Sequence, residues 1–300
     1  MKRNLFVGLA VAAGILAAAG CSTNIQGAPT TTTVSSTSVS ATAASHAVTY
    51  SRQVELPFGD NINHLAGVAV DTTSNVYVLD LHYGQVWKQA PGAVHLTQLP
   101  FTDLGRPVNV AVDTEGNLYV VDPFKNRVLK LAPGTTNPTV LPFNDIQAND
   151  AAVDAAGNVY VTDFYAGRVL KLAAGASSPI DLPFTVTRPD GVAADAAGNV
   201  YITDRNAKRV LKLAPGASSP TVLPFNDLDI PSDVAIGATG DVYVTDFGND
   251  RVLKLAAGAS SPTVLPFTDL KEPSDVAVDP ADNVYVVDDG HFRVLKLPAH

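Results

Sequence analysis

Val242-Tyr-Val-Thr-Asp-Phe-Gly-Asn-Asp-Arg-Val-Leu-Lys-Leu255 is the most informative part of the sequence, because varied copies of it recur along the chain. Each copy contains a Val-Tyr-Val-type run that ends in an aspartate. These aspartates are Asp80, Asp122, Asp163, Asp204, Asp246 and Asp288. A second marker, Leu-Pro-Phe, keeps the same interval, from Pro57 to Pro100 and on to Pro266. A repeat of about 42 residues predicts an array of similar structural units.

Each unit holds four short runs that are rich in β-branched and aromatic residues. In the copy around Asp246 they are Val234-Ala-Ile236, Val242-Tyr-Val-Thr245, Arg251-Val-Leu-Lys-Leu255 and Thr263-Val-Leu265. Turn-forming stretches separate these runs, which is typical of strands joined by hairpins, and no window keeps the 3.6-residue period of a helix. Four strands in a unit of this length indicate a propeller blade. The sequence therefore predicts an all-β, six-bladed β-propeller with four antiparallel strands per blade.

The two ends of the array predict how the ring closes. The last unit stops after its third strand, Arg293-Val-Leu-Lys-Leu297. The first unit is preceded by an additional segment, Arg52-Gln-Val-Glu-Leu-Pro57. This N-terminal segment can supply the fourth strand of the last blade and cover the open edge of that sheet.

The N-terminal region predicts export and a lipid anchor. In residues 1–20, Lys2 and Arg3 precede an apolar stretch, as in a secretion signal. The sequence Ala18-Ala-Gly-Cys21 resembles a bacterial lipobox, so we expect Cys21 to carry palmitate and hold the protein at the outer side of the cytoplasmic membrane or in the cell envelope. The alternative is an ordinary signal peptide with an incidental cysteine. Residues 21–49 are rich in Ser, Thr and Ala and predict a disordered tether, and residues 50–298 form the propeller.

Charge and cysteine content exclude several classes of function. The formal net charge is −9, and it becomes −11 after removal of the signal with its two positive charges. Lys and Arg occur singly on the strands instead of in clusters, so nucleic-acid binding is not expected. A single cysteine excludes an internal disulfide. We expect a monomeric propeller without a cofactor.

One face of the propeller is predicted to carry the variable residues. The loops between second and third strands differ from copy to copy, whereas the other connections, such as Asp154-Ala-Ala-Gly-Asn158, are nearly constant. Loops on a rigid scaffold are where recognition usually occurs, although drift in unconstrained loops is the alternative explanation. The candidate ligand-binding residues are His82, Tyr83, Phe124, Lys125, Phe164, Tyr165, Arg205, Lys208, Phe247, His291 and Phe292.

Polar residues just before the first strands form a second predicted group. Ring symmetry should bring them toward the central axis. The group consists of Asn109, Asp150, Asp190, Asp233 and Asp275. Several carboxylates at one mouth would raise one another's pKa values or attract a cation. The interpretation that we favour is that each residue caps its own strand or binds channel water, and we predict no metal site.

Ion pairs and histidines complete the candidate chemistry. Five of the six marker aspartates have an arginine five residues later, as Asp163 has Arg168, and we interpret this pair as structural. His64, His82 and His291 are the only histidines that the ring could bring together for a metal. Asp246-Phe-Gly248 spells the magnesium motif of kinases, but the glycine-rich loop and the His-Arg-Asp motif are missing, so a kinase is excluded.

The strings Pro273-Ser-Asp-Val-Ala-Val-Asp279 and Asn283-Val-Tyr-Val-Val-Asp288, followed by Arg293-Val-Leu-Lys-Leu297, resemble the NHL repeat. With Thr263-Val-Leu-Pro-Phe267 added, the array is similar to the extracellular sensor propeller of the mycobacterial transmembrane serine/threonine kinase D. This resemblance implies a rigid ring that presents a cup to an unknown ligand.

The sequence therefore predicts a cell-envelope lipoprotein that binds an extracytoplasmic ligand or protein through its variable face, as a non-catalytic sensor, adaptor or recognition module. The alternative is a divalent-metal-dependent propeller enzyme of the lyase or lactonase type, which the axial aspartates and the three histidines would favour. A structural or adhesive role in the cell wall is a third hypothesis.

Overall fold

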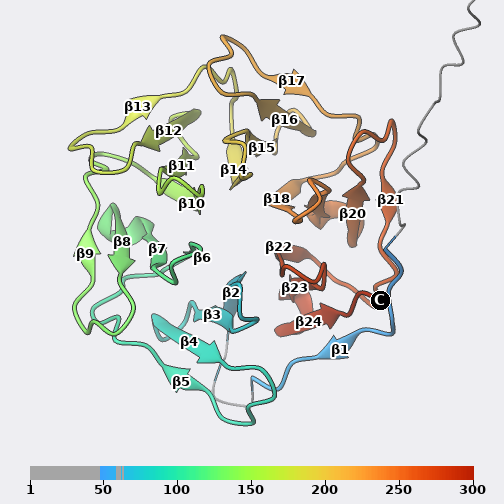
Figure 1. Cartoon of the computed structure of the whole chain (residues 1–300), viewed down its shortest axis with the longest axis horizontal. Coiled ribbons are helices and arrows are strands. Elements are labelled where there is room, and N and C mark those ends of the chain that lie inside the picture. The colour runs from blue at the N-terminus through green and yellow to red at the C-terminus, as the bar shows by residue number, and fades with distance from the viewer. Residues whose placement is uncertain (1–47, 59–61, 63) are drawn as a thin grey trace, which may run out of the picture. The chain divides into compact units, whose positions relative to one another are not determined.

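The computed structural model describes residues 48–58, 62 and 64–300 of the chain. These residues form six four-stranded sheets around a central axis (Figure 1). The predicted six-bladed propeller is confirmed, with antiparallel pairing within each blade. The expectations for the signal, for Cys21 and for most of the tether concern residues outside the described part of the chain.

Blade 5 contains the repeated stretch Val242–Leu255. Its strands are β18 (Pro231–Ile236), β19 (Val242–Asp246), β20 (Arg251–Leu255) and β21 (Thr263–Val264), in that order from the axis outward. The short 3-10 turn η2 (Phe247–Asn249) joins the second strand to the third. The first strand begins three residues earlier than the apolar run alone predicted, because its first half continues through polar residues that face the axis.

The other blades repeat this order. Blades 1 and 2 contain β2 (Leu65–Val70), β3 (Val76–Asp80), β4 (Gln85–Gln89), β5 (Thr97–Gln98), β6 (Asn109–Val112), β7 (Leu118–Asp122), η1 (Pro123–Lys125), β8 (Arg127–Leu131) and β9 (Thr139–Val140). Blades 3 and 4 contain β10 (Ala148–Val153), β11 (Val159–Asp163), β12 (Arg168–Leu172), β13 (Ile180–Asp181), β14 (Pro189–Ala194), β15 (Val200–Asp204), β16 (Arg209–Leu213) and β17 (Thr221–Val222). Blade 6 contains β22 (Pro273–Val278), β23 (Val284–Asp288), η3 (Asp289–His291), β24 (Arg293–Leu297) and β1 (Val54–Glu55). No helix in the described residues is long and apolar enough to cross a membrane.

The core lies between the blades. Every residue of each second strand is buried, because both faces of the sheet pack on a neighbouring blade. Six clusters of buried apolar side chains fill the six spaces between neighbouring sheets. A single blade could not bury its faces alone, so the blades stabilise one another.

The Leu-Pro-Phe marker has a structural explanation. Phe143 lies in the cluster that joins blades 2 and 3, where it packs with Val121 of one blade and Val161 of the next. Its backbone N–H donates to the carbonyl of Leu141 at 2.8 Å, which turns the chain sharply between blades. Phe58, Phe101 and Phe225 are buried in corresponding clusters. The phenylalanine therefore recurs because each connection between blades must fill the same gap.

The ring closes as the sequence predicted. Strand β1 pairs with β24 as the outermost strand of blade 6 (Figure 1), and an isolated bridge joins Tyr50 to Ala299. In blade 5, Gly237 stands where the other blades have the turn aspartate that accepts from the tyrosine of the second strand. The hydroxyl of Tyr243 instead lies 3.3 Å from that of Tyr50, and Lys254 Nζ donates to Tyr50 at the same distance. Blade 5 therefore helps to hold the closing segment.

We predict that Tyr50→Ala weakens this closure. The substitution removes a packed ring and leaves the buried ammonium group of Lys254 with one partner fewer, so the free energy of unfolding should fall by about 1–3 kcal/mol. Urea denaturation followed by circular dichroism measures it. Val264→Ala, an exposed position on β21, is the control and should change stability little. Equal stability of Tyr50→Ala and the wild type would contradict this role.

Candidate functional site

A buried aspartate ends the second strand of every blade and fixes the loop that follows it. Arg127 Nε donates to Asp122 Oδ2 at 3.1 Å, and Arg127 Nη2 donates to the carbonyl of Asp103 at 2.6 Å. The other carboxylate oxygen of Asp122 accepts from the backbone N–H of Gly105. The pair thus joins the hairpin to the segment that leads into the first strand of the same blade, as the structural interpretation of the Asp–Arg spacing required.

Equivalent pairs recur in blades 3 to 6. They join Asp163 to Arg168, Asp204 to Arg209, Asp246 to Arg251 and Asp288 to Arg293. In blade 1, Gln85 takes the arginine's place, and the Asp80 carboxylate accepts from the backbone N–H groups of His82 and Tyr83. We call the surface that carries these hairpin loops the loop face, and the opposite surface, with its constant turns, the turn face.

The variable residues are spread around the loop face instead of forming one patch. His82 and Tyr83 stack edge to face in blade 1, and Phe292 of blade 6 contacts His64 in the same way. Lys125 and Lys208 pair with the nearby carboxylates of Asp103 and Asp229. The side chain of Arg205 lies over the ring of Phe247, and both residues line a pocket at the axis. Only three of the aromatic residues lie together in one groove.

This aromatic groove lies between the loops of blades 2 and 3 and has a volume of about 420 Å³. Its lining residues are Pro123, Phe124, Asn126, Gln147, Ala148, Asn149, Phe164 and Tyr165. Phe124 and Tyr165 are 67% and 75% exposed, the high values expected of binding residues and not of core residues. Phe164 is half-buried and meets Tyr165 edge to face.

Two arginines contact the aromatic rings of the groove. The guanidinium group of Arg188 lies 4.3 Å from the centre of the Phe164 ring, and that of Arg106 lies 5.1 Å from the centre of the Phe124 ring. Such cation–π contacts hold the rings in place and occupy one face of each. The chain offers these aromatic groups on a fixed frame, which lowers the entropic cost of binding.

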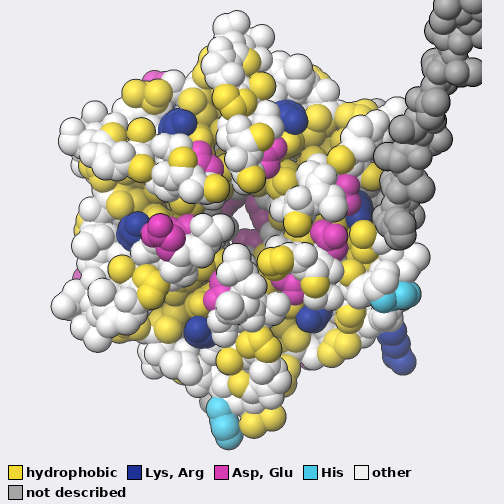
Figure 2. Space-filling model, viewed as in Figure 1, with side chains coloured by type: hydrophobic (Ala, Val, Ile, Leu, Met, Phe, Trp, Pro, Cys, Tyr) yellow, Lys and Arg dark blue, Asp and Glu magenta, His cyan; other side chains and the backbone are white. Residues whose placement is uncertain are grey.

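The predicted axial residues meet in a second pocket. This axial pocket has a volume of about 200 Å³, and its lining includes Asn109, Asn149, Asp150, Asp190, Arg205, Ser232, Asp233, Phe247, Ser274 and Asp275. Acidic side chains surround the hollow at the centre of the ring (Figure 2). Asp190 accepts from Arg205 Nη1 at 2.7 Å and from Asn149 Nδ2. The pocket therefore combines one ion pair with carboxyl groups that have no cationic partner within it.

Three of these carboxyl groups connect neighbouring blades, and one of them, Asp275, accepts a hydrogen bond from the backbone of Val68 in blade 1. Asp150 accepts from the backbone N–H of Val192 in blade 4, and Asp233 accepts from that of Val276 in blade 6. The expectation that each aspartate caps its own strand is only part of the explanation, since these bonds cross to the next blade. No group of three or more His, Cys, Asp or Glu side chains in the described residues is arranged to bind a metal ion.

Burial raises the pKa of the three axial carboxyl groups. It raises the pKa of Asp233 to about 7. Burial together with repulsion from Asp233 raises the pKa of Asp150 and Asp275 well above the usual value. At neutral pH the cluster therefore retains protons that water-exposed aspartates would have lost.

We predict that this cluster makes the stability fall as the pH rises. Between pH 3.8, the usual aspartate pKa, and about pH 7, the unfolded chain loses protons that folded Asp233 keeps, so the free energy of unfolding decreases. Asp233→Asn cannot ionise and should show a smaller decrease over the same range. Urea denaturation at several pH values compares the two proteins. Parallel curves for both would contradict the raised pKa.

The three histidines do not form a metal site in the described residues. His64 Nε2 lies 3.5 Å from Asp289, and His291 Nδ1 lies 2.9 Å from Asp288, while His82 packs on Tyr83. Each ring therefore has its own local contact. Asp288 is the last residue of β23 in blade 6, and Asp289 follows it.

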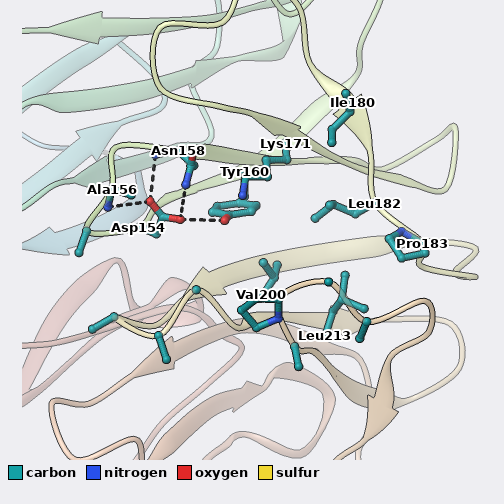
Figure 3. A pocket seen from close by; sticks show the side chains of 18 of the residues that line it. Asp154, Ala156, Asn158, Tyr160, Lys171, Ile180, Leu182, Pro183, Val200 and Leu213 are labelled. Carbon is teal, nitrogen blue, oxygen red and sulfur yellow. Dashed lines mark hydrogen bonds between the residues drawn. The ribbon is translucent and has the colours of Figure 1, made fainter. Parts of the chain in front are cut away.

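A further pocket lies on the turn face, between blades 3 and 4 (Figure 3), and measures about 550 Å³. It is wide because both neighbouring turns carry alanine pairs, Ala155-Ala156 and Ala196-Ala197. The polar groups of Asp154, Asn158 and Tyr160 are hydrogen-bonded to one another. Few groups are left to orient a ligand, so we consider this pocket a consequence of small turn residues.

Sequence reasoning missed the polar part of the aromatic groove. Asn126, Gln147 and Asn149 line it, yet none belongs to a repeated motif. Asn149 directly precedes Asp150, which the axial pattern did identify. The bulge between Ala148 and Ala151 brings Asn149 to the lining of both pockets, and no sequence signal marks such a bulge.

Comparison with known proteins agrees with the fold. The NHL repeat family matches residues 228–255 and 270–297, so the fifth and sixth blades contain NHL repeats. No curated protein is similar to the chain in sequence.

Several solved structures share the architecture. A catalytically inactive virginiamycin B lyase from Staphylococcus aureus with quinupristin is 11% identical, with a TM-score of 0.64 over 82% of this chain and 99% of that one. A gluconolactonase from Xanthomonas campestris is 13% identical, with a TM-score of 0.67 over 80% and 88%. A chain of a nidogen/laminin complex is 18% identical, with a TM-score of 0.64 over 77% and 97%. Identities this low establish the shared fold alone.

Proposed function

We propose that the protein is an exported, lipid-anchored recognition module whose loop face binds a ligand or protein of the cell envelope. The observation that carries this proposal is the aromatic groove, where Phe124 of blade 2 and Tyr165 of blade 3 are both exposed. Exposed aromatic side chains beside a preformed groove are the usual anchors of a binding interface. Of the remaining variable residues, Arg205 and Phe247 line the axial pocket, which shares Asn149 with this groove.

A sensor role is the finer form of this proposal. The repeats resemble the sensor propeller of a mycobacterial transmembrane kinase, and Cys21 would take the place of that protein's membrane helix as the anchor. The ring has the rigidity that a sensor needs to present a ligand to a signalling partner. Such a partner would contact the protein outside the cytoplasm.

We predict that Phe124→Ala combined with Tyr165→Ala abolishes partner capture. Both side chains are largely exposed, so thermal melting should remain unchanged while the contact area of the groove is lost. Crosslinking in intact cells, followed by purification of the tethered protein, measures the capture.

The matched control is Val222→Ala combined with Val264→Ala, which removes exposed apolar area from outer strands far from the groove. This control should capture the partner like the wild type. Undiminished capture by the Phe124 and Tyr165 variant would show that another surface binds the partner.

A divalent-metal-dependent propeller enzyme of the lyase or lactonase type is the second candidate. The axial pocket favours it, because buried carboxyl groups with raised pKa values often occur at active sites. The donor set fits a divalent cation poorly, since oxygens of Asp150 and Asp233 already accept backbone hydrogen bonds.

Metal analysis of the purified full chain separates the two candidates. A recognition module should retain far less than one divalent cation per chain after dialysis. A stoichiometric cation that is lost in Asp233→Asn, which should keep the fold, would favour the enzyme.

A further inference from the structure

We propose that the aromatic groove binds an uncharged carbohydrate, with part of the sugar chain reaching the axial pocket. This inference rests on the proposed function and names the chemical class of the ligand.

The lining of the groove argues against a charged ligand. None of its side chains carries a charge at neutral pH, and its only ionisable group is the Tyr165 phenol. Two arginines beside the groove, Arg106 and Arg188, lie over the rings of Phe124 and Phe164. An anionic or cationic ligand would lose hydration here without gaining an opposite charge in return.

The aromatic side chains suit the face of a sugar ring. Phe124 and Tyr165 are the two most exposed aromatic groups among the described residues. The flat face of a pyranose presents C–H groups, which pack favourably on the electron-rich face of an aromatic ring. Two such platforms across one groove can hold two neighbouring sugars of a chain.

The polar side chains suit hydroxyl groups. Three carboxamides, those of Asn126, Gln147 and Asn149, line the groove, and each offers both donors and acceptors. Gln147 Nε2 lies 2.9 Å from the Asn126 carboxamide, so these two groups form one connected polar edge. A sugar hydroxyl both donates and accepts, so it can form a hydrogen bond with the oxygen or with the nitrogen of a carboxamide.

The axial pocket continues the same chemistry. Asn149 lines both the groove and this pocket, so the two are adjoining. In the axial pocket, the buried oxygens Asn109 Oδ1 and Ser274 Oγ have no hydrogen-bond partner among the described residues. Asn109 is more than nine-tenths buried, and its amide nitrogen already donates to Asp275. A hydroxyl group is a neutral donor that would satisfy Asn109 Oδ1.

An extended peptide fits the groove less well. A peptide strand adds to a sheet through free backbone groups. In this groove the Gln147 carbonyl accepts from the Phe164 N–H, and Ala148 pairs with Asp163. These backbone groups are therefore already used, and recognition must come from side chains.

Affinity electrophoresis of the full chain in non-ionic detergent tests the proposal. Native gels would contain a neutral polysaccharide, namely galactomannan, arabinogalactan or β-glucan, and polygalacturonate serves as the anionic comparison. We expect retardation in at least one neutral gel. Tyr165→Ala should weaken the binding about tenfold, whereas Tyr165→Phe and Val222→Ala should bind like the wild type.

Retardation in none of the neutral gels, or in polygalacturonate alone, would overturn the carbohydrate proposal. So would retardation that Tyr165→Ala leaves unchanged.

A second measurement separates this failure from failure of the proposed function. Periodate cleaves the vicinal diols of sugars, so periodate treatment of cells before crosslinking should abolish groove-dependent capture. Capture that needs Phe124 and Tyr165 but survives periodate would overturn the carbohydrate while leaving recognition in place. Capture that is unchanged when Phe124 and Tyr165 are replaced by alanine would overturn the proposed recognition function.

Discussion

The buried carboxylate at the end of each second strand fixes the hairpin loop of its blade, and the geometry of the loop face follows from it. In five blades an arginine on the next strand pairs with this carboxylate, and in four of these the arginine also donates to a carbonyl of the chain that leads into the first strand. Removing one partner of such a pair would leave an uncompensated buried charge, at a cost of about 3–5 kcal/mol. The pair holds the hairpin loop and the axial segment in one fixed relation, and the candidate site lies between them.

Most of the fold could be predicted because it repeats. One unit, such as residues 234–265, does not show what packs on the two faces of its sheet, but six copies leave few arrangements other than a ring. The closing strand could also be foreseen, since the last unit lacks its fourth strand. The replacement of the turn aspartate by Gly237 could not be foreseen. It goes with the contact between the hydroxyl groups of Tyr243 and Tyr50, which are far apart in sequence.

The candidate site could be predicted only in part. Variation among the copies pointed to Phe124 and Tyr165, and ring symmetry pointed to the axial aspartates. Neither argument could reveal that Phe164 and Phe124 share a groove while Phe247 turns to the axis. Those differences depend on which arginine lies beside each ring, Arg188 beside Phe164 and Arg205 beside Phe247, and such contacts follow from tertiary packing instead of local pattern.

The closing contact between Thr49 and His300 places the two ends of the ring within hydrogen-bonding distance of each other. Because similar turns link the strands all around the ring, the packing does not dictate at which blade the chain must begin. A short peptide across these ends and a new opening at the exposed turn near Gly175 would give a circular permutant with the same wheel. The choice of the turn that is opened would then set how many residues separate the groove from a membrane anchor or a fused enzyme at the new terminus.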